Sequence, residues 1–383
     1  MAPNFDVIVV GVGGMGSATC YQLARQGVKV LGLEQFEIGH ALGSSHGESR
    51  LIRQAYFEAA DYVPLLKRSY ELWEALETRA KRSLFRKNGL IIMGPQKGGT
   101  VLPGVLKSAV AHGIELEILN QKKLRQRYPQ FTPPEGYQGY LEKNAGFLEV
   151  EKCVREFARI ARMYGATLNE QEPLQSWTAT NKGVTVKTAK GTYQAGKLIF
   201  TAGPWSAPLL KGLGISLSVR RVAQFWFSAP PVYDYTAGCP CFAFDGPDSF
   251  VYGFPQFGKN GLKLADHSPG DLVVKPEAVD RHIYPQDIAL LQRTIARCLP
   301  GVLPNPKKSA VCLYTLSNDE NFIIDFHPEF SSVIFAAGFS GHGFKFASVI
   351  GEILADLALL GQTKLPINFL RLRPKIYAPN PAP

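Results

Sequence analysis

The sequence lacks several patterns that would assign the protein to a specialised class. None of its apolar runs reaches the roughly 18 to 20 residues that a bilayer-spanning helix needs. Its six cysteines show no C-x-x-C spacing, so neither a zinc site nor a disulfide framework is indicated. No charged leader precedes the first apolar run. We therefore expect a cytoplasmic protein without a membrane segment or a bound metal.

Charge of one sign is not concentrated in any segment. The 42 Lys and Arg residues exceed the 32 Asp and Glu residues by ten, but they are spread along the chain without a recognition motif for nucleic acid. We expect a surface that mildly attracts anions and no nucleic-acid partner. With 383 residues and 45% hydrophobic residues, the chain can form two or three domains, at about 150 residues each.

The first 34 residues carry the most specific local pattern. An apolar run at 5–10 leads into a glycine-rich turn, a helical stretch and a second apolar run at 28–33 that ends at Glu34. The glycines of the turn are Gly11, Gly13, Gly14 and Gly16. They permit close approach of a pyrophosphate to the N-terminus of the helix, while Glu34 is positioned to accept from ribose hydroxyls. The pattern predicts a dinucleotide site without a 2′-phosphate, because a merely tight turn would not need the acid.

A similar order of strand, glycine turn and helix returns near the C-terminus. An apolar strand at 333–337 is followed by a turn at 338–345 that contains Gly341 and Gly343, and then by a helix that ends at Gly361. Between the two ends, helices are expected at 62–80 and 153–164 and strands at 184–187 and 198–201. No internal repeat is present.

These patterns predict an α/β fold: a Rossmann-like domain assembled from discontinuous segments, with an inserted mixed-sheet (α+β) substrate domain. The first domain is expected at 1–85, 146–217 and 310–383, and the second at 86–145 and 218–309. The arrangement favours FAD over a nicotinamide, since FAD must be held along its whole length. The helix after the second glycine turn would stabilise negative charge on the reduced flavin.

Four further stretches carry a family resemblance. They are G-S-S-H-G-E-S-R-L-I-R at 43–53, Y-G-F-P at 252–255, G-L-K at 261–263, and C-L-Y-T at 312–315 followed by G-F-S-G-H-G-F-K at 338–345. With the N-terminal pattern they resemble the monomeric sarcosine oxidase family, which includes N-methyltryptophan oxidase and the peroxisomal sarcosine and pipecolate oxidases of animals. The resemblance covers nearly the whole chain. It implies an FAD-dependent oxidase of amines that uses O2.

The resemblance implies roles for residues on the cofactor side. Cys312 matches the cysteine that carries FAD through a thioether, although a lone cysteine by itself is more often a small buried apolar residue. Arg50 and His46 match residues that lie beside the flavin and tune its electrostatics. Lys263 matches the lysine that helps to activate oxygen, where a fixed cation favours developing negative charge. The turn with Gly341, Gly343 and Lys345 is also expected to bind the cofactor.

On the substrate side, Arg53 and Lys345 match the residues that bind the substrate carboxylate. Arginine holds a planar carboxylate through two parallel hydrogen bonds. Arg50 and Arg53 are three residues apart and would share a face if the segment is helical or turn-like. Tyr252 and His267, grouped with the catalytic residues, and Tyr314 match residues that line the substrate pocket.

The identity of the substrate stays open. Ser45 departs from the bacterial sarcosine and methyltryptophan oxidases, which have a histidine at this position, and resembles the animal-type enzymes. The C-L-Y-T motif is closer to the sarcosine form, whereas the sequence around 344–353 is closer to the N-methyltryptophan form. Sarcosine is the first expectation, with N-methyl-L-tryptophan, L-pipecolate and L-proline as alternatives. A dehydrogenase that uses another electron acceptor, a flavin-binding protein without activity and, least of all, an NAD-dependent enzyme are different classes. The family pattern favours a monomer.

Overall fold

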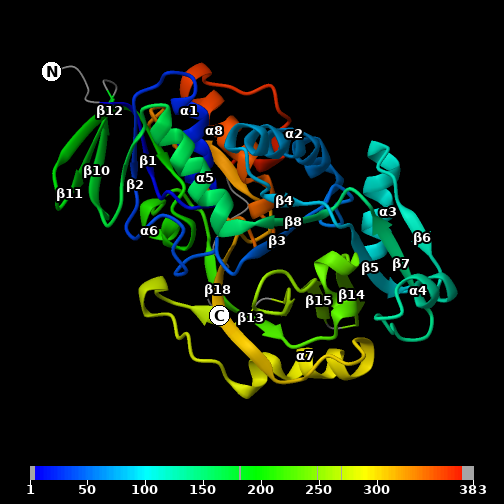
Figure 1. Ribbon diagram of the computed structural model, residues 1–383. Helices are drawn as coiled ribbons and strands as arrows, with labels where there is room; N and C mark the ends of the chain where they lie inside the picture. Colours follow the sequence, from blue (N-terminus) through cyan, green and yellow to red (C-terminus); the bar gives the residue numbers. More distant parts are fainter. Residues whose placement is uncertain (1–4, 181–182, 248, 269, 373–383) are drawn as a thin grey trace, which may run out of the picture.

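The computed structural model describes residues 5–180, 183–247, 249–268 and 270–372. Within these residues the strands form one sheet of eight strands, one of nine and one of three. Figure 1 shows the eight-stranded sheet with helices packed on it, and beside it a second part built around the nine-stranded sheet. No helix of the described ranges is both long and apolar enough to cross a membrane.

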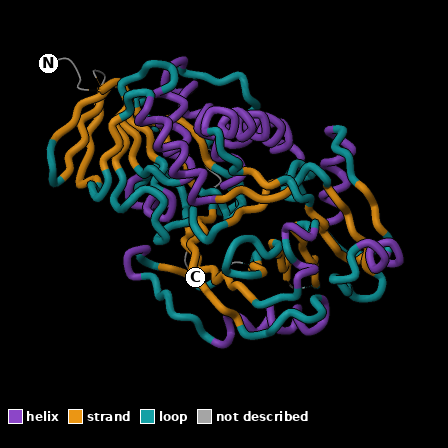
Figure 2. Tube along the Cα trace, in the orientation of Figure 1, coloured by secondary structure: helices purple, strands orange, loops and turns teal. Residues whose placement is uncertain are grey.

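The eight-stranded sheet has a parallel centre in the order β9, β2, β1, β12 and β20. These strands are Thr167–Asn169, Val30–Leu33, Phe5–Val10, Thr192–Phe200 and Val333–Ala337, respectively. β1 and β20 consist of continuous apolar runs because helices or other strands cover both faces of a parallel sheet. A hairpin of β10 (Leu174–Thr180) and β11 (Gly183–Thr188) pairs antiparallel with β12 and forms the outer edge in Figure 2. β19 (Ile323–Phe326) pairs antiparallel with β20 on the same side of β12 as this hairpin, and β9 forms the opposite edge.

Four helices accompany this sheet. They are α1 (Gly14–Ala24), α2 (Val63–Ala80), α5 (Val150–Met163) and α8 (Ala347–Leu360). α1 packs against both α5 and α8, and a Cβ at Gly351 of α8 would lie 2.6 Å from the backbone of Ala18, so this close approach requires glycine. The expected helices at 62–80, 153–164 and after 345 are confirmed, as is the left-handed cap at Gly361 with φ +72°. The strand expected at 28–33 begins later, at Val30.

The nine-stranded sheet runs in the order β17, β13, β16, β15, β14, β5, β7 and β6, with β18 on the free edge of β13. Its strands are Leu272–Val273, Ser218–Phe227, Leu262–Asp266, Ser249–Phe254, Cys241–Gly246, Leu90–Pro95, Tyr137–Glu142, Glu117–Leu119 and Pro306–Leu316, respectively. Only β5 and β14 among these pairs are parallel within the described residues, so the sheet is mixed. Helices α3 (Val101–His112), α4 (Gln121–Arg127) and α7 (Pro285–Cys298) belong to this part.

The three-stranded sheet connects the two parts, and its strand β3 contains Arg50, one of the two arginines considered above. It consists of β3 (Ser49–Ile52), β8 (Gly146–Glu149) and β4 (Phe85–Arg86). Because β3 is extended, side chains three residues apart point to opposite sides. The helical or turn-like condition for Arg50 and Arg53 to share a face is therefore not met, and the two guanidinium groups have different partners although both line the cavity described below.

The fold class is confirmed as α/β with a second, mixed-sheet part. The exact division of the chain stays a prediction. The long strand β18 belongs to the nine-stranded sheet along its whole length and so extends across the boundary expected at residue 310. Its far end delivers Leu313 to Thr315 to the cavity described next.

Candidate functional site

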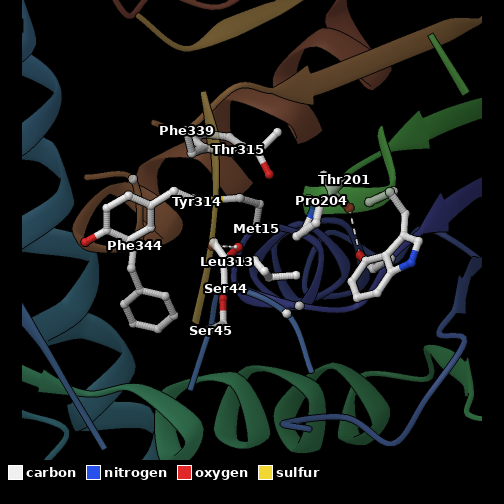
Figure 3. Close-up of a pocket in the computed structure, with 18 of the residues that line it drawn as sticks. Met15, Ser44, Ser45, Thr201, Pro204, Leu313, Tyr314, Thr315, Phe339 and Phe344 are labelled. Carbon is white, nitrogen blue, oxygen red and sulfur yellow. Dashed lines mark hydrogen bonds between the residues drawn. The ribbon is translucent and has the colours of Figure 1, made fainter. Parts of the chain in front are cut away.

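One cavity of about 400 Å³ extends from the first glycine turn to the second. Its wall comes from segments far apart in the sequence: the start of α1, the loop at 43–45, the end of β18 and the turn at 338–345. Figure 3 shows Ser44 and Leu313 side by side on this wall, where the Ser44 hydroxyl donates to the Leu313 carbonyl oxygen at 2.5 Å. Loop and strand are thereby joined across 269 residues of sequence.

The first turn has the geometry that the sequence predicts. A Cβ at Gly16 would lie only 1.8 Å from the carbonyl oxygen of Gly11, so α1 can approach β1 only with glycine there. Glu34 is buried at the end of β2, and its carboxylate accepts from the backbone N–H groups of Val12 at 2.8 Å and Phe36 at 3.0 Å. Burial raises the pKa of the Glu34 carboxyl, while these two N–H groups oppose the shift. Gly11, Gly13, Gly14 and Glu34 all line the cavity.

The cavity wall carries polar atoms that suit a large polar cofactor. Trp205 Nε1 and Thr315 Oγ1 are buried on this wall and have no hydrogen-bond partner among the described residues. Unpaired buried polar groups are rare in folded proteins and call for a ligand or water. Together with the exposed N-terminus of α1 and the carboxylate of Glu34, these groups fit a dinucleotide. No group of three or more metal-ligating side chains occurs within the described ranges.

Of three residues expected beside the cofactor, one lines the cavity and two are buried next to it. Arg50 lines the cavity, and its Nη2 lies 3.3 Å from the Sγ of the buried Cys312 and donates to the carbonyl oxygen of Ser44 at 2.8 Å. His46 is buried nearby. Burial, and then the charges of Arg50 and Lys263, lower the pKa of His46 to about 3, so its ring is neutral at pH 7.

Lys263 is 2% exposed and lies on β16. Its Nζ donates to the carbonyl oxygens of Gly47 at 2.6 Å and Ser49 at 3.0 Å. The ammonium also lies over the Phe254 ring at 4.9 Å from its centre. Burial, and then the charge of Arg50, lower the pKa of Lys263 well below its usual value. The sequence context of Lys263 alone would suggest an exposed surface lysine, but in the structure it is buried.

Two cations meet at the other end of the cavity. The Arg53 guanidinium lies between the rings of Tyr56 and Phe57, at 4.5 and 4.3 Å from their centres. Lys345 Nζ lies 5.1 Å from the centre of the same Tyr56 ring and donates to the carbonyl oxygen of His342 at 2.6 Å. Burial, and then the charge of Arg53, lower the pKa of Lys345 to about 7.

Sequence reasoning missed Glu58, which is the partner of Arg53. Arg53 Nη2 donates to both carboxylate oxygens of Glu58, at 2.7 and 2.6 Å. Burial alone would raise the pKa of Glu58, but the charge of Arg53, with smaller effects of His342 and Lys345, lowers it to about 2. The only available signal was an acid five residues after an arginine, which is too common to be specific. Below about pH 7, where Lys345 is protonated, two cations and one anion leave one positive charge for a ligand.

The wall between these cations and Arg50 is aromatic. Tyr252 and Tyr314 approach through their hydroxyl groups at 3.5 Å, and His267 Nδ1 lies 3.4 Å from the Tyr314 hydroxyl. All three line the cavity, so the structure brings together the residues expected around a substrate. Gly341 has φ +77°, and a Cβ there would lie 2.4 Å from the Tyr314 ring. A Cβ at Gly343 would lie 2.6 Å from Phe339, so both glycines keep the second turn close to its neighbours.

Comparison with known proteins agrees with this geometry. Residues 6–357 match the family model described as FAD dependent oxidoreductase. The chain belongs to this FAD-dependent oxidoreductase family. It is 40% identical over 377 residues to the monomeric sarcosine oxidase of Bacillus sp. (strain NS-129), with 97% of each chain covered. It is 36% identical to the N-methyl-L-tryptophan oxidase of Yersinia pestis, with 93% of this chain and 95% of the relative covered.

The human peroxisomal sarcosine oxidase is a further relative, 34% identical, with 93% of this chain and 92% of the relative covered. The resemblance to the monomeric sarcosine oxidase family is thereby confirmed. Among solved structures, NikD, an unusual amino acid oxidase essential for nikkomycin biosynthesis, superposes with a TM-score of 0.84 at 26% identity, with 96% of this chain and 97% of that chain covered. The protein is therefore an FAD-dependent oxidoreductase.

Proposed function

We propose that the protein is a flavoprotein oxidase of secondary amino acids, with sarcosine as the first candidate substrate. The observation that carries the proposal is the pair of buried cations, Arg53 and Lys345, around the Tyr56 ring in the cavity that also contains the dinucleotide turn. The names of the relatives support a small N-methyl or cyclic amino acid. N-methyl-L-tryptophan, L-pipecolate and L-proline are alternative substrates.

The substrate carboxylate would bind to the single net positive charge of Arg53, Lys345 and Glu58. This contact fixes the C–H bond next to nitrogen in one orientation, so the entropy of alignment is lost on binding rather than in the reaction. The cations around the cavity lower the pKa of a bound amine and favour its unprotonated, reactive form. Tyr252, Tyr314 and His267 close the aromatic side of the pocket.

When bound, FAD supplies the two-electron acceptor of the reaction. The amino acid loses two electrons and two protons to give an imine, which water hydrolyses to an aldehyde and a primary amino acid. Oxygen gains the same two electrons and two protons and becomes hydrogen peroxide. Lys263 would assist oxygen by placing a fixed positive charge where negative charge develops.

The residues that would hold FAD extend along the cavity. The first glycine turn and Glu34 would bind the adenosine and pyrophosphate, and the turn with Gly341 and Gly343 would bind the flavin end. Cys312 would carry the flavin through a thioether, with Arg50 and His46 beside it. We further propose a monomer in the cytoplasm, with the FAD-binding and substrate domains divided as the sequence predicts.

The test is anaerobic reduction of the purified yellow protein. Sarcosine, N-methyl-L-tryptophan, L-pipecolate and L-proline are added one at a time, and the absorbance of the oxidised flavin is followed. Bleaching by one amino acid, followed by recovery in air with one peroxide per flavin, is the expected result. Absence of bleaching by all four would contradict the proposed substrate class.

The variant Lys263→Met separates an oxidase from a dehydrogenase. An oxidase should still be bleached by substrate in this variant but should recover slowly in air. If the unmodified protein bleaches but recovers only when a quinone or another artificial acceptor is added, the protein is a dehydrogenase. Acid precipitation provides the matching test of the thioether, because a covalent flavin stays with the protein.

A further inference from the structure

A half-buried arginine of the cavity wall and a buried lysine share one backbone carbonyl group. The carbonyl oxygen of Ser49 accepts from Arg50 Nη1 at 2.9 Å and from Lys263 Nζ at 3.0 Å. Lys263 also donates to the carbonyl oxygen of Gly47 at 2.6 Å. Like charges at such close range disfavour each other's charged form, and burial acts on lysine in the same direction. A group that favours the charged form of Lys263 must therefore act against both burial and Arg50.

The carboxylate of Glu151, in the first turn of α5, holds the segment that receives Lys263. Its Oε1 accepts from the N–H groups of Gly47 at 2.6 Å and Glu48 at 3.1 Å, and its Oε2 accepts from the N–H of Glu48 at 3.0 Å. The carbonyl of Gly47 and the N–H of Glu48 belong to one peptide unit. In a trans peptide these two groups point in opposite directions, so Glu151 and Lys263 lie at opposite ends of the same dipole.

This arrangement is electrostatically favourable at both ends. The anion lies at the positive end of the peptide dipole and the ammonium at its negative end, and hydrogen bonds linked in a chain polarise and strengthen one another. Removing the charge of Glu151 would weaken the bond from Lys263 to Gly47 without touching Lys263 itself. Glu151 thus acts on the lysine through one peptide group.

Glu48 supplies a second, weaker anchor for the same segment. It has a left-handed backbone, with φ +72°, which is uncommon outside glycine. Its carboxylate accepts from Trp226 Nε1 at 2.9 Å, from Lys308 Nζ at 2.8 Å and from Asn260 Nδ2. The Trp226 ring lies 5.4 Å from Lys263 Nζ. These three hydrogen bonds keep Glu48 in this conformation, although the Glu48 side chain is about one-third exposed.

The charged and titratable groups around Lys263 come from four elements. Arg50 on β3 opposes its charge, and His46 in the preceding loop is neutral. Glu151 on α5 and Glu48 favour the charge and raise the pKa of the lysine against the larger effects of burial and Arg50. Cys312 on β18 would do so only as a thiolate, which the proposed thioether excludes. Glu151 is the one of the two acids whose side chain is bonded to the peptide that Lys263 contacts.

We propose that Glu151, assisted by Glu48, is a positioning residue that keeps Lys263 charged and directed, and thereby controls the reaction with oxygen rather than the oxidation of the amino acid. The proposal rests on the proposed oxidase function. Glu151 lies outside the cavity, and the proposal gives it a role only in the reaction of the reduced flavin with oxygen.

The first test needs no substrate. The flavin spectrum of the oxidised holoprotein is titrated from pH 5 to 10.5, and the step that disappears in Lys263→Met is assigned to the lysine. In Glu151→Gln, whose amide oxygen can still accept from the Gly47 and Glu48 N–H groups, this step should move to lower pH by about one unit, the size of effect that a nearby charge commonly produces. Glu74→Gln removes an exposed acid paired with Lys87 and should leave the step unchanged.

The second test separates the two halves of the reaction. One pH unit above the Lys263 step of the parent protein, the rate of recovery in air should fall about tenfold in Glu151→Gln, in line with the shifted titration, while the rate of anaerobic bleaching should change less than twofold. An unchanged titration step, equal slowing of both rates, or absence of a step that depends on Lys263 would each overturn the proposal.

Should Glu151→Gln fail to retain flavin, Glu48→Gln takes its place. The proposal then requires a smaller shift of the same step to lower pH, and no shift overturns it. Failure of the proposed function is recognised separately, because it appears as absence of bleaching in the unmodified protein, whereas the titration depends only on bound flavin and Lys263.

Discussion

Replacing Glu58 by glutamine should destabilise the protein by about 3 kcal/mol at pH 7. The reason is the paired geometry at Arg53, whose Nη2 lies 2.7 and 2.6 Å from the two carboxylate oxygens. The pKa of Glu58 is about 2 in the folded protein, compared with about 4.3 for an exposed glutamate. At about 1.36 kcal/mol for each pKa unit, the difference corresponds to roughly 3 kcal/mol of stability at neutral pH. Breaking a buried ion pair by removing one partner commonly has an effect of about 3 to 5 kcal/mol.

The pH dependence of this effect has a defined sign. Because the pKa of Glu58 is lower in the folded than in the unfolded state, its stabilisation is fully present above about pH 4.3 and is lost as the pH falls toward 2. The difference between the parent protein and Glu58→Gln should therefore stay constant from pH 7 to pH 5. It should shrink by about 1 kcal/mol at pH 3.5.

Thermal unfolding of the holoprotein measures both the loss of stability in Glu58→Gln and its dependence on pH. For 383 residues, an unfolding entropy of about 2.1 cal/mol/K per residue converts 3 kcal/mol into a decrease in Tm of roughly 4 °C. Glu71→Gln is the matched control, because its carboxylate is 63% exposed and pairs with Arg68 at the surface. A decrease below about 1 °C at pH 7, or the same decrease at pH 3.5 as at pH 7, would refute the reasoning.

Three further predictions concern the ligands of the cavity. A simple carboxylate without an amine, such as propionate, should bind more weakly as the pH rises through about 7, where Lys345 loses its charge, and Lys345→Met should abolish this dependence in a flavin-absorbance titration. Cys312→Ser should release its flavin into the supernatant on acid precipitation, whereas the parent protein keeps the colour; colour in both supernatants would rule out a thioether. Gly16→Ala should yield protein without flavin, because the new Cβ would lie 1.8 Å from the Gly11 carbonyl oxygen, and normal flavin content would contradict the tight turn.

The parts of the fold that could be predicted from the sequence are those with local causes. The strand, glycine turn and acid of residues 5–34 follow one another within a single βαβ unit, so their spacing alone defines a site. The apolar stripe of α8 and its cap at Gly361 are also local. Cys312 and Lys263 required the family resemblance, because nothing in the composition around either residue distinguishes it from an ordinary core cysteine or surface lysine.

The remaining parts depend on pairings between distant segments. The extended conformation of 49–52, which carries Arg50, could not be predicted because it is decided by pairing of β3 with β8, about 100 residues later. Glu58 was missed because its effect depends on a close contact with Arg53 that a spacing of five does not reveal. Glu151 was missed because its partners are backbone N–H groups 103 and 104 residues away, which no side-chain pattern can indicate.

The two acids that sequence reasoning missed, Glu58 and Glu151, act on different cations of the site. Glu58 pairs with Arg53 and leaves the substrate end with one net positive charge, which suits one carboxylate. Glu151 lies outside the cavity and favours the charge of Lys263 through the Gly47–Glu48 peptide. Removing Glu58 should therefore alter substrate binding and stability, while removing Glu151 should alter the oxygen reaction. Measuring both half-reactions in both variants tests this separation directly, and a variant that changes both rates equally would contradict it.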